Sequence, residues 1–356
     1  MNSLATAAEQ KALLLRNFLL HGPAQQQGGD NRGAVAGTLQ SNGAAHYVYG
    51  EITGYYLHWL ASLPLSAAEL QAPSQAAVDW LQRYLHSDGM PLTRIYLHDA
   101  VQDWRNDALF AFDLAMIAGG LARVSNRKLA VLPPPLIADL QQWLLHFLDK
   151  QGVAVCIKRT PAVDLPQRWS TSGGAFTAKT ASRILMLGSQ VALDAGLLQA
   201  CRVELQDKAV LAGQQGIDML HPTLYALEGC LLSPGADIEK LASWFEQISA
   251  LQAADGTLPE SLQTPEVRRT DVIAQALRVA IFLESLLSQP GRYQKTTDGL
   301  ARALLQRVRD DGSVGFSSDG KTEANIWSGM FAEQALSLYA AHVRQQPLPF
   351  IADSVV

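Results

Sequence analysis

Apolar and aromatic residues recur at three-to-four-residue spacing along most of the chain, which is the period of a helix with one buried stripe. The segment around Glu51 shows the pattern clearly, because Tyr55, Tyr56, Trp59 and Leu60 follow this carboxylate at helical spacing. Runs of alternating Val, Ile and Thr hardly occur, whereas Ala, Leu, Gln and Glu dominate the periodic segments. The pattern predicts an all-α protein.

Glycine-containing breaks divide these periodic segments into a repeat. Each break follows an amphipathic helix and precedes a more apolar one, as at Asp88-Gly89, Gln151-Gly152, Asp255-Gly256 and Asp311-Gly312. Glycine suits the left-handed conformation that commonly ends a helix, so we expect turns there. The apolar second helices are expected at 112–124, 177–187, 270–287 and 325–341, with weaker copies in the helix that Glu51 opens and at 221–232.

Six helix pairs repeating at roughly 50–60 residues are typical of a stacked or closed array of supersecondary units. We therefore predict an (α/α)6 toroid, one domain spanning 1–356, with the apolar helices inside and the charged ones outside. Residues 1–45 would hold the first outer helix and a flexible glycine-rich loop. Six long loops, each from an outer to an inner helix, should gather at one end of the barrel, where we expect the functional site.

Composition narrows the possible partners. A chain of 356 residues with 48% hydrophobic residues can bury a sizeable core. Its formal net charge is -5 and no run of Lys or Arg forms a basic stripe, so nucleic acid is not expected as a partner.

The cysteines and the chain start bear on the compartment. Cys156, Cys201 and Cys230 lie far apart without a CxxC pair, which fits a reducing compartment and argues against a zinc cluster. The first residues lack the features of a signal peptide, and no apolar run approaches the length of a membrane span. We expect a cytoplasmic protein, whose oligomeric state the sequence leaves open.

Known catalytic motifs are missing. The chain has no P-loop, GxGxxG, HExxH, GxSxG, DxDD or DDxxD sequence. We therefore expect no cofactor and no metal, and no terpene-cyclising chemistry.

The starts of the second helices carry the residue types that a sugar site needs. Aromatic faces stack on pyranose rings, and carboxylates accept from hydroxyls or transfer protons. The best-placed acids are Glu51, Asp113 and Asp271, with His221 and Tyr55 as secondary catalytic candidates. The candidate substrate-binding residues are Trp169, Lys179, Tyr225, Arg268, Arg269, Gln275, Glu323, Asn325 and Trp327. The long loops add further polar and aromatic residues, among them Arg94, Trp104, Arg105, Arg168 and Glu260.

Each candidate also has a structural interpretation. Glu51 and Asp271 occupy first-turn positions, where a carboxylate is favoured by the helix dipole, and Asn325 suits an N-cap.

Three functions fit this ring of residues. Two carboxylates that face each other with their pKa values driven apart would hydrolyse a glycosidic bond with inversion, which is the leading hypothesis. Arg268 and Arg269, with Lys179 and Arg183, would instead hold an acidic sugar while His221 or Tyr55 abstracts a proton, as in an epimerase or lyase. The third hypothesis is a non-catalytic glycan-binding or assembly module.

Several motifs together resemble a known family. They are YGEITGY (49–55), FD (112–113), HPTLYALEG (221–229), RTDVIAQALR (269–278) and NIWSGMFAEQAL (325–336). From about residue 45 onward the chain is similar to the six-hairpin or prenyltransferase-like toroid proteins found among bacterial polysaccharide-biosynthesis functions. Members of that family more often have Pro than Gly before the Glu of the first motif.

The resemblance implies the (α/α)6 fold and a carbohydrate context, and it transfers no catalytic role. More loosely, the chain is similar to the wider toroid group of glycoside hydrolases, polysaccharide lyases, uronyl epimerases and sugar 2-epimerases. Squalene-type cyclases share the alternation of helix and Gln/Asp-Gly turn, but the missing acid motif counts against that branch.

Overall fold

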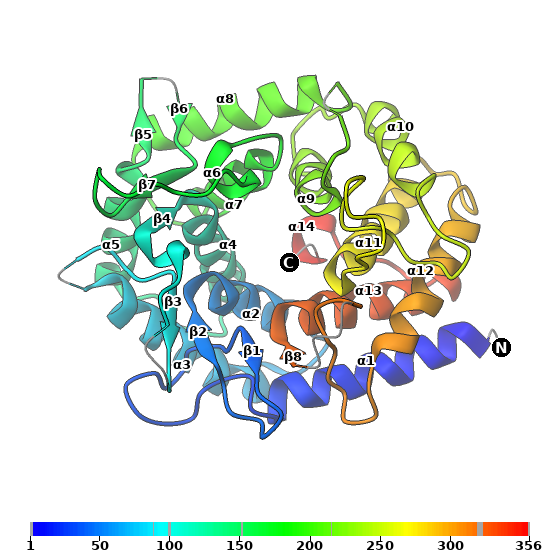
Figure 1. Cartoon of the computed structure of the whole chain (residues 1–356), viewed down its shortest axis with the longest axis horizontal. Helices are drawn as coiled ribbons and strands as arrows, with labels where there is room; N and C mark the ends of the chain where they lie inside the picture. Colours follow the sequence, from blue (N-terminus) through cyan, green and yellow to red (C-terminus); the bar gives the residue numbers. More distant parts are fainter. Residues whose placement is uncertain are drawn as a thin grey trace.

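Two concentric rings of helices make up the protein in the computed structural model, which describes residues 3–87, 89–98, 101–150, 152–214, 216–318 and 323–354 (Figure 1). The inner ring comprises α2 (Gly50–Ser62), α4 (Ala111–Asn126), α7 (Thr177–Gly188), α9 (Leu220–Cys230), α11 (Thr270–Leu286) and α13 (Ile326–Val343). The outer ring comprises α1 (Ser3–His21), α3 (Ala67–Leu85), α5 (Pro134–Leu145), α8 (Ala195–Leu211), α10 (Ile238–Ser249) and α12 (Gln294–Arg307). The predicted (α/α)6 toroid is confirmed. Asp88 and Gln151 of the predicted turns lie outside the described residues.

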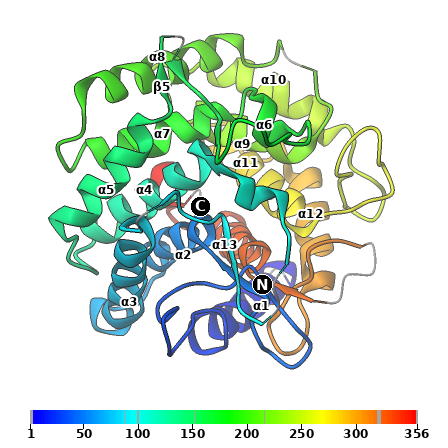
Figure 2. The same cartoon turned by 60° about the vertical axis from the view of Figure 1, so that its left-hand side comes forward.

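The inner ring is closed. Consecutive inner helices contact each other in the order α2, α4, α7, α9, α11 and α13, and α13 returns to contact α2. Each outer helix packs on the inner helix that precedes it, and α1 packs on α13 and α12, so the start of the chain lies against its end. The outer helices keep their outer positions when the molecule is turned (Figure 2). Inner helices are therefore buried on almost every face, which explains their nearly uniform apolar composition.

Polar side-chain caps are found mainly on outer helices. Ser66 forms a capping box with Glu69 at α3, and Asp194 and Asp237 accept N–H groups of α8 and α10, whereas α5 and α12 have no side-chain cap. The inner helices α2, α4, α9 and α11 instead start from extended residues with no side-chain cap. At α11 the first-turn carboxylate of Asp271 instead accepts the backbone N–H of Val272 at 2.8 Å.

Short strand pairs join the loops that lead into the inner helices. The first loop pairs with the second through β2 (Tyr47–Tyr49) and β3 (Arg94–Tyr96), and the second with the third through β4 (Ala108–Phe110) and β7 (Cys156–Lys158). The remaining pairs are β1 (Thr38–Leu39) with β8 (Ala324–Asn325) and β5 (Leu148–Asp149) with β6 (Gly152–Val153). Isolated bridges, Met219 to Ser261 and Arg269 to Ser317, link the fourth, fifth and sixth loops.

One expectation about the loops is wrong. The fourth connection, residues 212–219, is short, because α8 continues to Leu211 and α9 begins at Leu220. Within the described ranges, no strand pair joins it to the third loop, where the short helix α6 (Trp169–Ser172) lies instead.

The opposite end of the barrel is covered by the C-terminal segment. The short helix α14 (Ile351–Ser354) contacts α2, Asp353 forms an ion pair with Arg123, and the carbonyl of Ala352 lies 3.3 Å from Nε2 of His58. In the part of the chain that the structure describes, no helix combines the length and apolarity needed to cross a membrane.

Close packing of α2 on α4 depends on two glycines. A Cβ added at Gly54 would lie 2.6 Å from the backbone of Met116 and Ile117, and one added at Gly120 would lie 2.2 Å from the carbonyl of Gly54. These neighbours are backbone atoms, which cannot rotate away. The first two inner helices can therefore approach this closely only without side chains at the crossing.

We expect Gly54→Ala to lower the free energy of unfolding by about 3 kcal/mol, because the added methyl group forces α2 and α4 apart. Urea denaturation would measure the loss. The control is Gly28→Ala, where nothing lies within 4 Å of the added Cβ. Equal stability of the two variants would contradict the close crossing.

Candidate active site

A cavity of about 470 Å³ lies where the inner helices begin. Its aromatic lining includes Tyr49, Trp104, Phe112, Trp169, Tyr225 and Trp327. Its charged lining consists of Glu51, Arg94, Arg105, Arg168, Glu260 and Arg269. Aromatic rings beside charged groups are the combination that a polar ligand with apolar faces requires.

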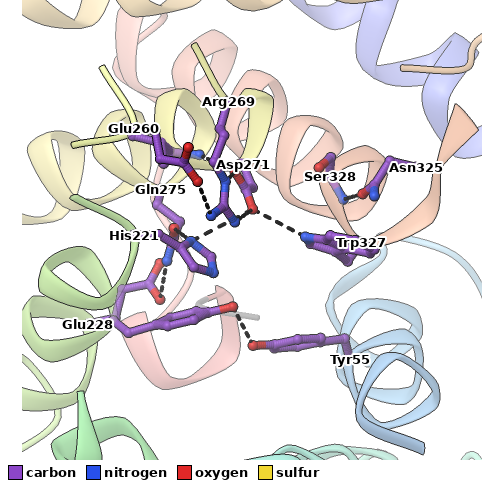
Figure 3. Close-up of polar contacts among 12 residues, drawn as sticks. Tyr55, His221, Glu228, Glu260, Arg269, Asp271, Gln275, Asn325, Trp327 and Ser328 are labelled. Carbon is purple, nitrogen blue, oxygen red and sulfur yellow. Dashed lines mark hydrogen bonds and ion pairs between the residues drawn. The ribbon is translucent and has the colours of Figure 1, made fainter. Parts of the chain in front are cut away.

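A hydrogen bond between two tyrosines forms the floor. The hydroxyl of Tyr55 on α2 donates to the hydroxyl of Tyr225 on α9 at 2.8 Å, and α2 and α9 are opposite members of the inner ring (Figure 3). Glu51 precedes Tyr55 by one helical turn, and His221 precedes Tyr225 by one turn. Glu51 and His221, which both line the cavity, therefore occupy opposite walls above this floor.

Glu51 belongs to a pair of buried carboxyl groups whose pKa values are both raised. Burial raises the pKa of Glu51 and, together with the charge of Glu51, raises the pKa of Asp113 well above its usual range. Asp113 lies behind the cavity wall and accepts a hydrogen bond from the hydroxyl of Tyr49 at 3.0 Å. The N-cap residue of α2, Tyr49, forms no side-chain hydrogen bond with the helix start, and hydrogen bonds from Tyr49 and Tyr55 partly offset the rise in the pKa of Glu51.

The Nδ1 atom of His221 lies close to two acceptor oxygens. This atom lies 2.7 Å from Oε1 of Gln275 and 3.7 Å from Oδ2 of Asp271, and both of these oxygens are acceptors. Burial, followed by the charge of Arg269, lowers the pKa of His221 to about 3. Its other ring nitrogen lies on the side of the ring away from Gln275 (Figure 3).

Asp271 is buried behind the cavity wall. Nε and Nη2 of Arg269 hold its two oxygens at 3.0 and 2.6 Å, and the indole nitrogen of Trp327 donates to it at 3.2 Å. Burial raises the pKa of Asp271, but the charges of Arg269 and His221 and the hydrogen bonds from Arg269 and Trp327 together lower it to about 2. Asp271 therefore stays ionised, is absent from the cavity lining, and fixes the two residues that do line it.

Below the floor lies a buried ion-pair cluster centred on Glu228. Its carboxylate accepts from Lys179 at 2.6 Å, from Arg278 at 2.7 Å and from the amide nitrogen of Gln275 at 3.4 Å. The Lys179 ammonium lies 4.3 Å from the centre of the Tyr225 ring, and burial lowers the pKa of Lys179 to about 7 although Glu228 opposes the shift. Lys179 and Gln275, both predicted to bind substrate, thus lie beneath or behind the cavity rather than in its wall.

Three other predicted binding residues lie away from the cavity. Nη1 of Arg268 donates to the carbonyl of Pro265, Glu323 is exposed and pairs with His46 at 3.8 Å, and Asn325 caps α13 by accepting the N–H of Ser328 at 2.9 Å. Of the predicted binding residues, those that line the cavity are Trp169, Tyr225, Arg269 and Trp327.

Arg94, Arg105 and Arg168 line the cavity although they were not among the predicted binding residues. Two of them adjoin a tryptophan, as Trp104-Arg105 and Arg168-Trp169. A cation beside an aromatic residue in a loop is the sequence feature that would have identified them.

Among the residues that the structure describes, no group of three or more His, Cys, Asp or Glu side chains could hold a metal ion.

Comparison with known proteins identifies the fold. No protein-family model and no curated protein sequence matches the chain. A cellobiose 2-epimerase from Spirochaeta thermophila superposes with a TM-score of 0.67 at 12% identity, over 97% of this chain and 99% of that chain. A glycosidase variant in complex with glucose gives 0.64 at 13% identity, over 98% and 100%. A type II terpene cyclase from Scytonema gives 0.59 at 14% identity, over 96% and 99%. At these identities the likeness shows the fold alone, and it confirms the toroid that the sequence resemblance implied.

Proposed function

We propose that this protein is a carbohydrate-active enzyme that epimerises a sugar by moving a proton at a carbon next to a carbonyl group. The observation that carries the proposal is the placement of Glu51 and His221 on opposite walls of the cavity, above the bond between Tyr55 and Tyr225. A proton removed from one face of a carbon and replaced on the other inverts its configuration. That reaction needs an acid and a base on opposite sides of the substrate.

The two groups have complementary protonation states. Burial raises the pKa of Glu51, although hydrogen bonds from Tyr49 and Tyr55 and the charges of Arg94 and Lys179 oppose the rise. Burial also favours neutral imidazole at His221, with its Nδ1–H donating to Gln275 and its Nε2 lone pair available. In the reaction we propose, Nε2 of neutral His221 offers a lone pair to the substrate proton, and Glu51 acts in its protonated form.

The proposed step balances as follows. Nε2 of His221 takes the proton from the substrate carbon, and the electron pair of the broken C–H bond forms an enediolate. Glu51 then delivers its proton to the opposite face of the same carbon, which leaves a carboxylate at Glu51 and an imidazolium at His221. Both groups return to their starting states by proton exchange with water. The guanidinium of Arg94, whose charge acts on Glu51, stabilises the negative charge of the intermediate.

Substrate binding would use the aromatic walls. Trp169 and Trp327 line the cavity on the sides between Glu51 and His221, where each ring can stack on a face of a pyranose or an opened sugar chain.

Hydrolysis of a glycosidic bond is the second candidate, and the pair of Glu51 and Asp113 favours it. An inverting hydrolase needs an ionised base across the bond from its acid. Asp113 lies on α4, the inner helix next to the one that carries Glu51, and therefore not across the cavity from it. Asp271 is held by Arg269 outside the cavity. Glu260 lines the cavity but pairs with Arg269 at 3.1 Å. Proton transfer through His221 is therefore the better supported reaction. The polysaccharide-biosynthesis setting implied by the resemblance stays a prediction.

We expect His221 to be neutral, with its proton on Nδ1, from pH 8 down to about pH 4, because Gln275 accepts that proton and burial lowers the pKa to about 3. Two-bond ¹H–¹⁵N correlation spectra of histidine-labelled protein would detect this tautomer. His221→Gln would assign the signal by removing it. An Nε2–H tautomer or an imidazolium at pH 6 would contradict the role as base.

The same depressed pKa predicts how stability depends on pH. Between pH 6.5 and about 3 the unfolded chain binds a proton at His221 that the folded protein excludes, so this residue makes the protein less stable as the pH falls through that range. The His221→Gln variant should lose less stability than the wild type over the same interval in urea denaturation.

The reaction itself is tested with reducing sugars in deuterated water. We expect deuterium to enter the substrate next to its carbonyl carbon, as seen by proton NMR and mass spectrometry. His221→Gln and Glu51→Gln should each slow exchange by about 100-fold or more, because each removes one general acid–base group. Arg268→Gln, outside the cavity, is the control and should exchange normally.

Three results would overturn the proposal of epimerisation. Cleavage of oligosaccharides without deuterium uptake would favour hydrolysis, and binding with neither change would favour a glycan-binding module. Undiminished exchange in both active-site variants would remove Glu51 and His221 from the reaction.

A further inference from the structure

We infer that Arg94, Arg105 and Arg168 form a binding site for an anionic group of the ligand, so that the substrate of this cavity is an acidic sugar. The inference rests on the proposed function in taking the ligand to be a sugar, but not on any reaction. All three guanidinium-bearing residues line the cavity, and they come from its second and third loops. These loops form the wall between α2 and α9 on the side of α4 and α7.

Arg94 is built rigidly into this wall. Its backbone is held on both sides by the side chain of Asn106, which accepts from the Arg94 N–H at 2.8 Å and donates to its carbonyl at 2.9 Å. The guanidinium lies 4.5 Å from the centre of the Tyr47 ring and 5.7 Å from that of Tyr49. Its Nη1 bonds to Asp103 at 3.1 Å, while its buried Nε has no hydrogen-bond partner in the structure. A buried donor without a partner is costly in a folded protein.

Arg105 shares the same carboxylate. Nη1 of Arg105 lies 3.1 Å from the other oxygen of Asp103, and its guanidinium lies 4.6 Å from the centre of the Trp104 ring. Asp103 also accepts from the hydroxyl of Tyr96 at 3.0 Å and from the backbone N–H of Arg105. Burial raises the pKa of Asp103, but the N–H of Arg105 and the two guanidiniums lower it below its usual range overall. The ionised carboxylate of Asp103 therefore pairs with both guanidiniums.

Arg168 adds a third cation. It is exposed at the start of α6, beside Trp169, and lines both this cavity and the adjoining groove at the fourth connection. Within the described residues, Arg168 forms no ion pair. Arg94 and Arg105 pair with Asp103, and Arg168 adds a further guanidinium, so this wall carries more cations than paired carboxylates.

The opposite wall is different. Arg269 is paired with Asp271 at 2.6 Å and with Glu260 at 3.1 Å, so its charge is more than balanced. The cavity is therefore polarised, with a cationic wall formed by the second and third loops and a balanced wall formed by the fifth. A ligand with an anionic group would place that group toward Arg94, Arg105 and Arg168.

This assignment replaces the arginines and lysine from which the sequence suggested an acidic sugar. Arg268 bonds to Pro265 outside the cavity, Lys179 pairs with Glu228 below the floor, and Arg183 is buried against His58 at 3.1 Å. An acidic sugar is still the expected ligand, but Arg94, Arg105 and Arg168 are the residues that would bind its anionic group.

Arg94 and Arg105 also have an effect that needs no ligand. Their charges oppose the rise in the pKa of Asp113, as Arg94 does for Glu51. This effect does not involve Arg168, and it does not distinguish acidic from neutral sugars. A test of anion binding must therefore compare ligands that differ only in charge.

The experiment is isothermal titration calorimetry of the full chain with matched pairs of ligands. The pairs are D-glucuronate with D-glucose and D-galacturonate with D-galactose, and glucose 6-sulfate and glucose 6-phosphate test other anions. We expect at least one acidic sugar to bind about tenfold or more tightly than its neutral partner, and the difference to shrink at high salt. Which anion binds most tightly identifies a carboxylate, sulfate or phosphate ester as the natural group.

The decisive variant is Arg105→Gln combined with Arg168→Gln, which leaves the Arg94 anchor of the loop in place. It should abolish the preference for the acidic sugar while leaving the neutral sugar's affinity and the melting temperature unchanged. Arg268→Gln removes a guanidinium that lies outside the cavity and should keep the preference.

Equal binding of acidic and neutral sugars by the wild type, or no binding of any acidic sugar, would overturn the inference. So would a preference that survives in the double variant. These outcomes are independent of deuterium exchange, so the anion site and the proposed reaction fail or succeed separately.

Discussion

One buried carboxylate, Glu228 on α9, organises the centre of this toroid. It receives Lys179 from α7 and Arg278 and Gln275 from α11, so three inner helices meet at a single charge. Removing one partner of a buried ion pair leaves the other charge uncompensated and typically costs about 3–5 kcal/mol. Because Gln275 donates its amide to Glu228, its carbonyl oxygen is left to face His221. The carboxylate that holds the helices together therefore also sets the tautomer of the histidine above it.

The cavity depends on this cluster in a second way. Lys179 lies beneath the rings of Tyr225 and Tyr55, at 4.3 and 5.5 Å from their centres, so a cation supports the tyrosine bridge from below. The bridge holds α2 and α9 at a fixed separation, which in turn fixes the distance between Glu51 and His221. Their pKa shifts arise from the same enclosure, since burial disfavours the charged form of both groups. Position and protonation state thus have a common origin in the closed inner ring.

The fold follows from the sequence far more directly than the site does. Helical periodicity and glycine breaks located α7 at 177–187 and α11 at 270–287, within a residue of the observed ends, because these helices pack through regularly spaced side chains. Periodicity contains no information on how a loop crosses the barrel, so Arg94, Arg105 and Arg168 were expected on the long loops but were not chosen as binding residues. Asp271, by contrast, was predicted to be a catalytic residue but lies outside the cavity. Its position at a helix start matched that of Glu51, and only the three-dimensional placement of Arg269 and Trp327 distinguishes a held carboxylate from one that faces the cavity.

The packing of α1 on α13 affects the order in which the chain can fold. Arg16 reaches Glu333, which lies 317 positions further along the chain, and α1 has its main packing partner in the last inner helix. During synthesis α1 is made before α13, so its apolar stripe of Ala8, Ala12, Leu15 and Leu19 stays without its native cover until α13 has been made. Contacts between such distant segments form slowly, and exposed apolar surface favours association in the meantime. The packing of α1 on α13 is therefore a late step of folding, and the apolar stripe of α1 stays exposed until that step.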